Sequence, residues 1–218
     1  MVKFFVTQII FLVLFVIPTT VLAQTTTAKS VDRITKLENK IASREAKIAQ
    51  KVENIEKKLE DRKAKIASQT ATLKARLDKF KDQQKAKRVE NINTNLNKIN
   101  DNRVAAMNKF LDKTSAILDR VETRINAATD KDTTVAKTAI TEARTAIEAA
   151  RAAVETQSTK NYSIALTSET TAKTDAQKAY TTLRTDLQAT KEIVTTAKQA
   201  VAKAIQTAAA TLGETNGQ

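Results

Sequence analysis

Between Gln24 and Leu212 the chain contains neither glycine nor proline, and this absence limits the available folds more than any other feature. Both glycines, Gly213 and Gly217, lie close to the carboxyl end, and the single proline is Pro18. The corners of β-sandwiches and α/β folds depend on these two residue types for tight turns. We therefore expect an all-α protein with no sheet, in which long amphipathic helices form an elongated coiled coil or a helical bundle.

The residue types that are missing also exclude most catalytic chemistry. The chain has no cysteine and no histidine, so it cannot form a thiolate or imidazole nucleophile or a Cys/His metal site. A glycine-rich phosphate loop is excluded by the position of the two glycines. Carboxylates such as Glu60 and Asp61 are adjacent, but neighbouring side chains on a helix point apart. We expect that the protein is not an enzyme and has no catalytic, cofactor-binding or metal-binding residues.

Residues 1–23 have the layout of a secretory signal peptide. Lys3 lies in a short positive region, an apolar stretch runs from Phe4 to Ile17, and Val21 and Ala23 precede the expected cleavage point before Gln24. The alternative is an uncleaved membrane anchor, because the segment approaches the about 20 residues that span a bilayer. Both readings predict an extracytoplasmic protein, either secreted or held at the cell surface.

Hydrophobic spacing divides the rest of the chain into helices. Apolar residues from Ile34 to Phe80 recur in steps of three, four and seven, which keeps them on one face of a helix. A second series, from Val89 to Ile125, is rotated around the helix axis relative to the first. Within 81–88 we therefore expect either a tight helical hairpin or a continuous helix whose buried face moves around it.

The later part of the chain contains two further helices and a segment of different periodicity. Tyr162, Ile164 and Leu166 alternate with polar residues, which predicts an extended connector because no partner strand is available. The expected organisation is a signal peptide or anchor at 1–23, a basic amphipathic long helix at 24–88, a second helix at 89–128, a loop at 129–134, an Ala-rich helix at 135–157, an extended connector at 158–167, an Ala/Thr-rich helix at 168–212 and a disordered tail at 213–218.

Six asparagines crowd the segment 91–102. Asn95 and Asn102 are the two that we expect to face the seam between helices, where asparagine can fix the register. More often such a run of asparagines is an exposed and only weakly helical segment, because asparagine is a poor interior helix former.

Charge is unevenly distributed along the chain. The protein has 37 basic and 24 acidic residues, and the segment 24–88 holds 19 of the basic and 9 of the acidic ones. On a helix, 12 of these 19 basic residues fall in one sector beside the apolar stripe, and seven of the nine acidic residues lie on its other side. The predicted anion-binding edge consists of Lys29, Arg33, Lys36, Lys40, Arg44, Lys47, Lys51, Lys58, Arg62 and Lys65.

This charge pattern bears on how the helices associate. In a parallel pair of identical helices, the basic edge of one faces the acidic edge of the other. An antiparallel hairpin of the first two helices would instead bring like charges together, at about 0.2–0.5 kcal/mol per exposed pair. We therefore expect self-association through parallel helices, unless packing overrides the repulsion in a hairpin.

Together these features predict an exported, non-catalytic helical scaffold, spacer or interaction protein of the cell envelope. Its basic edge would bind anionic envelope polymers or lipid headgroups. The alternatives are a basic holdase-type chaperone, which needs an accessible apolar surface, and a helical protein that binds membrane surfaces. Nucleic-acid binding is disfavoured and would be non-specific, because few aromatic residues are suited to base stacking. No small-molecule substrate is expected.

Overall fold

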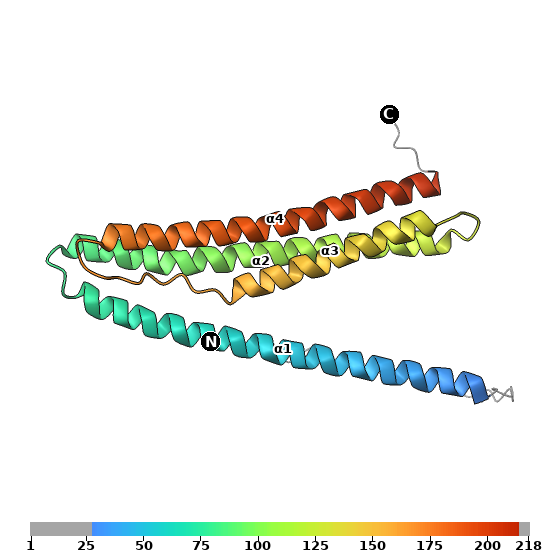
Figure 1. Cartoon of the computed structure of the whole chain (residues 1–218), viewed down its shortest axis with the longest axis horizontal. Helices are drawn as coiled ribbons and strands as arrows, with labels where there is room; N and C mark the ends of the chain where they lie inside the picture. Colours follow the sequence, from blue (N-terminus) through green and yellow to red (C-terminus); the bar gives the residue numbers. More distant parts are fainter. Residues whose placement is uncertain (1–27, 214–218) are drawn as a thin grey trace, which may run out of the picture. The chain divides into compact units, whose positions relative to one another are not determined.

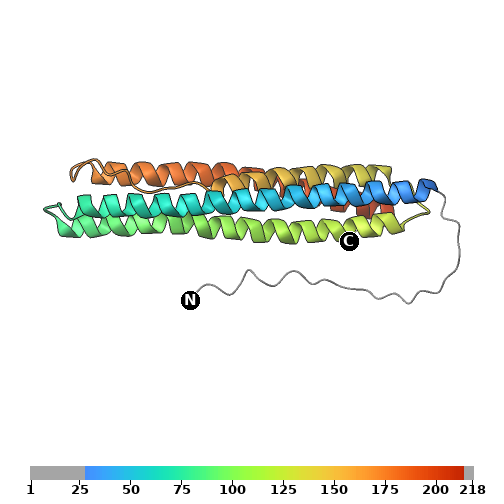
Figure 2. The ribbon, with the colours of Figure 1, turned by 90° about the horizontal axis from the view of Figure 1, so that it is seen from below.

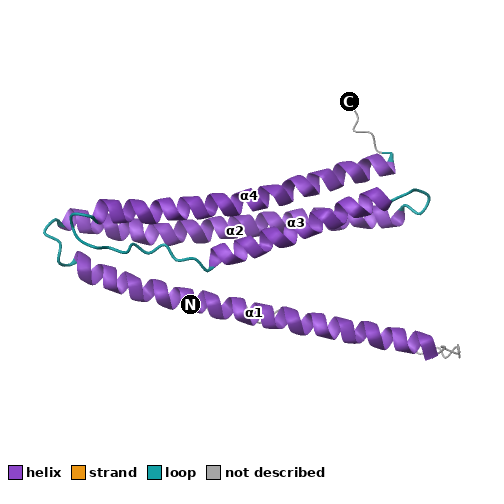
Figure 3. Ribbon diagram, in the orientation of Figure 1, coloured by secondary structure: helices purple, strands orange, loops and turns teal. Residues whose placement is uncertain are grey.

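The computed structural model describes residues 28–213, which form four long helices joined by turns and one extended connector (Figures 1 and 3). No strand occurs in this range, so the predicted all-α fold class is confirmed. The chain divides into two units at 50/51, a boundary that falls within the first helix, and of these units the structure describes 28–50 and 51–213. The expected signal peptide and nearly all of the expected tail lie outside the described residues. The helices are α1 (Ala28–Leu77), α2 (Gln83–Ala127), α3 (Thr134–Ser158) and α4 (Ala172–Leu212).

The basic segment expected as one helix over 24–88 is instead interrupted by a hairpin turn. α1 ends at Leu77 and α2 begins at Gln83, so the hairpin alternative replaces the continuous helix. Asp82 caps α2 by accepting a hydrogen bond from the backbone N–H of Lys85 at 2.9 Å. Phe80 is buried at the turn, which ties this short polar segment to the core. The chain thus turns from α1 into α2 without glycine or proline, because Phe80 is buried in the core and the Asp82 carboxylate caps the start of α2.

A second carboxylate, from the start of the α4 region, also holds this turn. Glu169 accepts the backbone N–H groups of Lys81 and Asp82, each at 3.0 Å. These two hydrogen bonds lower the pKa of the Glu169 carboxyl, because they favour its charged form. The α1–α2 turn and the entry to α4 are therefore fastened together at one end of the unit formed by 51–218.

Three helices, α2, α3 and α4, run along one another in this unit (Figures 1 and 2). Ion pairs show that α2 and α3 are antiparallel: Asp119 meets Arg144 at 2.8 Å, and Asp112 meets Arg151 at 2.8 Å. Lys203 of α4 lies 3.1 Å from Glu142 of α3. Close approach of the helices is allowed by fully buried alanines along the α3 seam, namely Ala136, Ala143 and Ala150.

The apolar core consists of two clusters that follow each other along the helices. One cluster lies among α2, α3 and α4 and includes Leu111, Leu118, Ile140 and Val201. The other joins the end of α1, the start of α2, the connector and the start of α4. Burial of such side chains is the main stabilising contribution in a chain without disulfides. The members of the second cluster are Leu73, Leu77, Phe80, Ala86, Val89, Leu96, Tyr162, Ile164, Leu166, Ala172, Ala176 and Leu183.

The second cluster exists because α3 is shorter than its neighbours. α3 has 25 residues and α4 has 41, so α4 is longer by about 24 Å at 1.5 Å per residue. The extended residues 160–167 can span about 26 Å, and they occupy the place that a longer α3 would fill. Tyr162, Ile164 and Leu166 all point into the core and are buried, in keeping with their alternating pattern.

Side chains of α2 supply the hydrogen bonds that a strand or helix would otherwise give the connector. The side-chain oxygen of Asn97 accepts the N–H of Tyr162 at 3.1 Å, and that of Asn93 accepts the N–H of Ile164 at 2.8 Å. The buried asparagines are therefore Asn93, Asn97 and Asn100. The prediction for Asn95 and Asn102 was wrong, because both are exposed.

The buried face of α2 also differs from the predicted apolar series. Ile92, Ile99 and Ile117 are 40, 40 and 46% exposed, whereas Leu111 and Leu118 have no exposed surface. The difference arises because α2 contacts both α3 and α4, which shifts its buried face toward the side between those two helices. An apolar stripe is thus left partly open on one flank of α2.

Candidate anion-binding edge of α1

All ten residues of the predicted anion-binding edge lie on α1. In the unit formed by 1–50, the side chains of Lys36 and Lys47 are exposed. In the unit formed by 51–218, the side chains of Lys51, Lys58 and Lys65 are exposed. The side chains of four further members lie outside the described ones: Lys29, Arg33, Lys40 and Arg44.

The three lysines of the larger unit share one side of the helix. Lys51, Lys58 and Lys65 are spaced by seven residues, so each is displaced by only about 20° from the one before it. The Lys51 ammonium lies 3.8 Å from the Glu155 carboxylate of α3. The Lys51 side chain is exposed and that of Glu155 half-buried, and a surface pair at this distance contributes about 0–1 kcal/mol, so Lys51 can still meet another anion.

Arg62 does not belong to an exposed edge, and this corrects the sequence-based assignment. Only 9% of the residue is exposed, and its guanidinium is held on three sides by polar groups of the protein. Nε donates to the Lys160 carbonyl at 2.6 Å, Nη1 lies 2.8 Å from an Asp101 carboxylate oxygen, and Nη2 donates to the Asn97 side chain at 3.4 Å. Arg62 thus joins α1 to the connector and to α2, because the N–H groups of its planar guanidinium match the positions of these acceptors.

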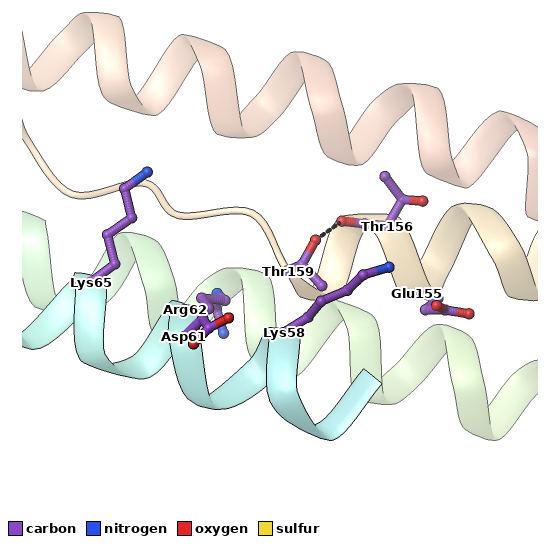
Figure 4. A pocket seen from close by; sticks show the side chains of 7 residues that line it. All are labelled: Lys58, Asp61, Arg62, Lys65, Glu155, Thr156 and Thr159. Carbon is purple, nitrogen blue, oxygen red and sulfur yellow. Dashed lines mark hydrogen bonds between the residues drawn. The ribbon is translucent and has the colours of Figure 1, made fainter. Parts of the chain in front are cut away.

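A shallow cavity of about 340 Å³ lies beside Arg62, between α1 and the end of α3 (Figure 4). The side chains of Lys58 and Lys65 extend to either side of Arg62 in this view. Thr159, at its wall, donates a hydrogen bond to the Thr156 carbonyl at 2.9 Å. The lining residues are Lys58, Asp61, Arg62, Lys65, Glu155, Thr156 and Thr159.

The charges around this cavity decide what it can bind. Asp61 and Glu155 offset much of the charge of Lys58 and Lys65, so the cavity is not built for a single small anion. The exposed lysines on the same side of α1 can instead meet successive charges of a long polyanion. Such contacts are electrostatic and weaken with salt, because the partners remain solvated.

Sequence analysis did not identify the residues that neutralise the acidic edge of α2. Asp112 and Asp119 meet Arg151 and Arg144 of α3, and Glu122 also contacts Arg144. The sequence does carry a signal for these pairs. Asp112 and Asp119 are seven residues apart, and so are Arg144 and Arg151 on α3, which runs antiparallel to α2. Between α1 and α2 the described ion pair, Arg62 with Asp101, joins opposite charges, and Asp112 and Asp119 of α2 are paired with arginines of α3.

A buried polar layer between the two apolar clusters was also missed. The Gln157 side-chain amide donates to the Asn100 side chain and to the Tyr162 hydroxyl, both at 2.7 Å, and accepts from Thr190 at 3.3 Å. The Tyr162 hydroxyl then donates to the Asp186 carboxylate at 2.9 Å. Burial raises the pKa of Tyr162, and the hydrogen bond to Asp186 raises it further.

This polar layer is structural. Throughout the described residues, every buried side-chain nitrogen or oxygen has a hydrogen-bond partner, so the layer leaves no group aimed at a ligand. Within 28–213, carboxylates do not gather into a metal site. None of the described helices has an apolar stretch sufficient to cross a membrane. Comparison with models of protein families, with curated proteins and with solved structures finds no match for the chain.

Proposed function

We propose that this protein is an exported, non-catalytic helical scaffold of the cell envelope that binds anionic polymers along α1. The observation that carries the proposal is the row of exposed lysines at positions 51, 58 and 65 on one side of a long helix. The helix holds these cations in a fixed line, which suits a repeating polyanion better than a compact ligand. The excess of positive charge in the segment 24–88 supports the same interpretation.

Removing this row of charge tests the proposal. In the triple variant Lys51→Gln, Lys58→Gln, Lys65→Gln, we expect binding to polyphosphate or dextran sulfate to weaken about tenfold at low salt. Each lysine close to an anionic surface contributes at most about 1 kcal/mol, and 1.4 kcal/mol is a factor of ten. Titration by fluorescence anisotropy at several salt concentrations measures both the affinity and its salt dependence.

A matched variant separates the edge from net charge alone. Lys109, Lys113 and Lys137 are exposed on α2 and α3, and replacing all three with glutamine removes the same amount of charge. We expect this control to bind polyanions nearly as well as the unmodified protein. Equal weakening of the two triple variants would show that binding depends on total charge and not on α1.

Export is the second part of the proposal and has its own measurement. We expect the protein isolated from an exporting host to begin at Gln24, because the segment before it has the order of charge, apolar core and small residues that signal peptidases recognise. Amino-terminal sequencing and intact mass report the first residue directly. Recovery of a membrane-associated chain that still begins at Met1 would favour the retained-anchor alternative instead.

A further inference from the structure

A groove runs between α2 and α4 on the flank of α2 that carries the open apolar stripe. It consists of two adjoining cavities of about 720 and 340 Å³, and Tyr180 lines both. The first extends from Asp82 to Ile92 along α2, and the second from Ile99 to Met107. On α4 the two cavities together reach from Ala172 to Lys191, which is about 30 Å of helix.

The floor of the groove is apolar. Ile92 and Ile99 of α2 are 40% exposed, and Tyr180 of α4 is 50% exposed. The partly buried Leu187 and the buried Leu183 continue this surface along α4. Ile92, Ile99 and Tyr180 together form an apolar strip along the two cavities. Apolar strips of this kind mark interaction sites more often than scattered apolar residues do.

The rims of the groove are basic along its whole length. Asp82 is the one carboxylate among the described residues that line the two cavities, and its side chain caps α2. Each cavity is lined by cations from both α2 and α4. Positive charge therefore lies at both ends of the groove and on both of its sides. They are Lys85, Arg88 and Lys173 in the first cavity, and Arg103, Arg184 and Lys191 in the second.

We propose that this groove binds an amphipathic helix of a partner protein, with acidic residues on both sides of its apolar face. The two helices run in the same direction along the groove, and a groove between two helices accepts a third helix through apolar anchors. The distribution of cations selects the partner, because carboxylates along both margins of such a helix would meet both rims. A single-chain anionic amphiphile carries its charge at one end only, so it would leave most of these cations unmatched.

A synthetic peptide provides a direct probe. It is an amphipathic helix of about 21 residues, or about 30 Å, with a leucine seam flanked by glutamates. Its control is a scrambled peptide of the same composition, which has equal charge but no apolar face. By fluorescence anisotropy with the whole protein, we expect the amphipathic peptide to bind at least tenfold more tightly than the scrambled one.

Variants locate the binding to the groove. Ile99→Ser with Tyr180→Ser removes two apolar anchors and should weaken peptide binding at least tenfold. Val135→Ser with Ile193→Ser removes two exposed apolar side chains that line neither cavity and should leave it unchanged. Arg103→Gln with Arg184→Gln should weaken binding and reduce its salt dependence, which provides a readout that does not involve the apolar floor.

Three results would overturn the proposal. The first is equal affinity for the amphipathic and the scrambled peptide, and the second is unchanged affinity in both groove variants, once circular dichroism shows that they are folded. The third is binding of dodecyl phosphate in the groove with no binding of the acidic helix, which would identify an anionic amphiphile as the occupant. The lysine variant of α1 should bind the peptide normally, so this test is independent of polyanion binding.

Discussion

Replacing Leu118 with alanine is expected to lower the free energy of unfolding by about 3–4 kcal/mol. Leu118 has no exposed surface and lies in the apolar cluster among α2, α3 and α4. Truncation of a fully buried leucine removes its transfer free energy and leaves a cavity, and such changes cost about 2–5 kcal/mol. The three helices around the site are long and closely packed, so little collapse into the cavity is expected.

The adjacent residue provides the matched control. Ile117 is 46% exposed, so Ile117→Ala should change the free energy of unfolding by no more than about 1 kcal/mol. Urea denaturation followed by circular dichroism measures both variants under the same conditions. Because the two positions differ by one residue on α2, equal losses would show that the rotation of α2 about its axis is not the one described.

Replacing Gln157 with leucine is expected to cost about 2–4 kcal/mol, although leucine is apolar and similar in size. The change removes the donor that serves Asn100 and the Tyr162 hydroxyl, and the acceptor that serves Thr190. A buried polar group that loses its partner costs about 1–3 kcal/mol. The Asn100 side-chain oxygen loses its partner, whereas the hydroxyls of Tyr162 and Thr190 each lose one hydrogen bond and keep the one to Asp186. The effects are not additive, because the neighbouring groups can re-pair in part.

Gln188→Leu is the control for this substitution. Gln188 is exposed on α4 and hydrogen-bonds Glu192 within the same helix, so its replacement should change stability by less than about 0.5 kcal/mol. Denaturant midpoints and slopes of the two variants give the comparison. If Gln157→Leu proves as stable as the unmodified protein, the polar layer does not hold the connector in the way described here.

The all-α fold could be predicted from the sequence because the evidence for it is local. The absence of glycine and proline and the spacing of apolar residues act within one segment at a time. The break between α1 and α2 lies at 78–82, a few residues before most of the predicted window 81–88, because its position depends on Phe80 entering a distant core and on Glu169 meeting the turn from the start of α4. Interactions across about 90 residues leave no periodic signal in either segment.

Charge was harder to interpret than hydrophobicity. Spacing placed Arg62 in the basic sector of α1, but it could not reveal that the connector passes that point and that Asp101 lies opposite. The same limit applies to Asn93 and Asn97, whose partners are backbone groups of the connector. Periodicity assigns a residue to a side of a helix, whereas its role depends on which segment packs against that side.

The connector that completes the shorter α3 also restricts how the chain can change in length. Its buried residues alternate with exposed or half-buried ones, and its backbone is bonded to fixed side chains of α2. Loss or gain of one residue there would reverse which side chains point inward, while a change of two preserves the alternation. Insertions and deletions compatible with this packing therefore come in even numbers, a parity rule that a helical segment in the same place would not impose.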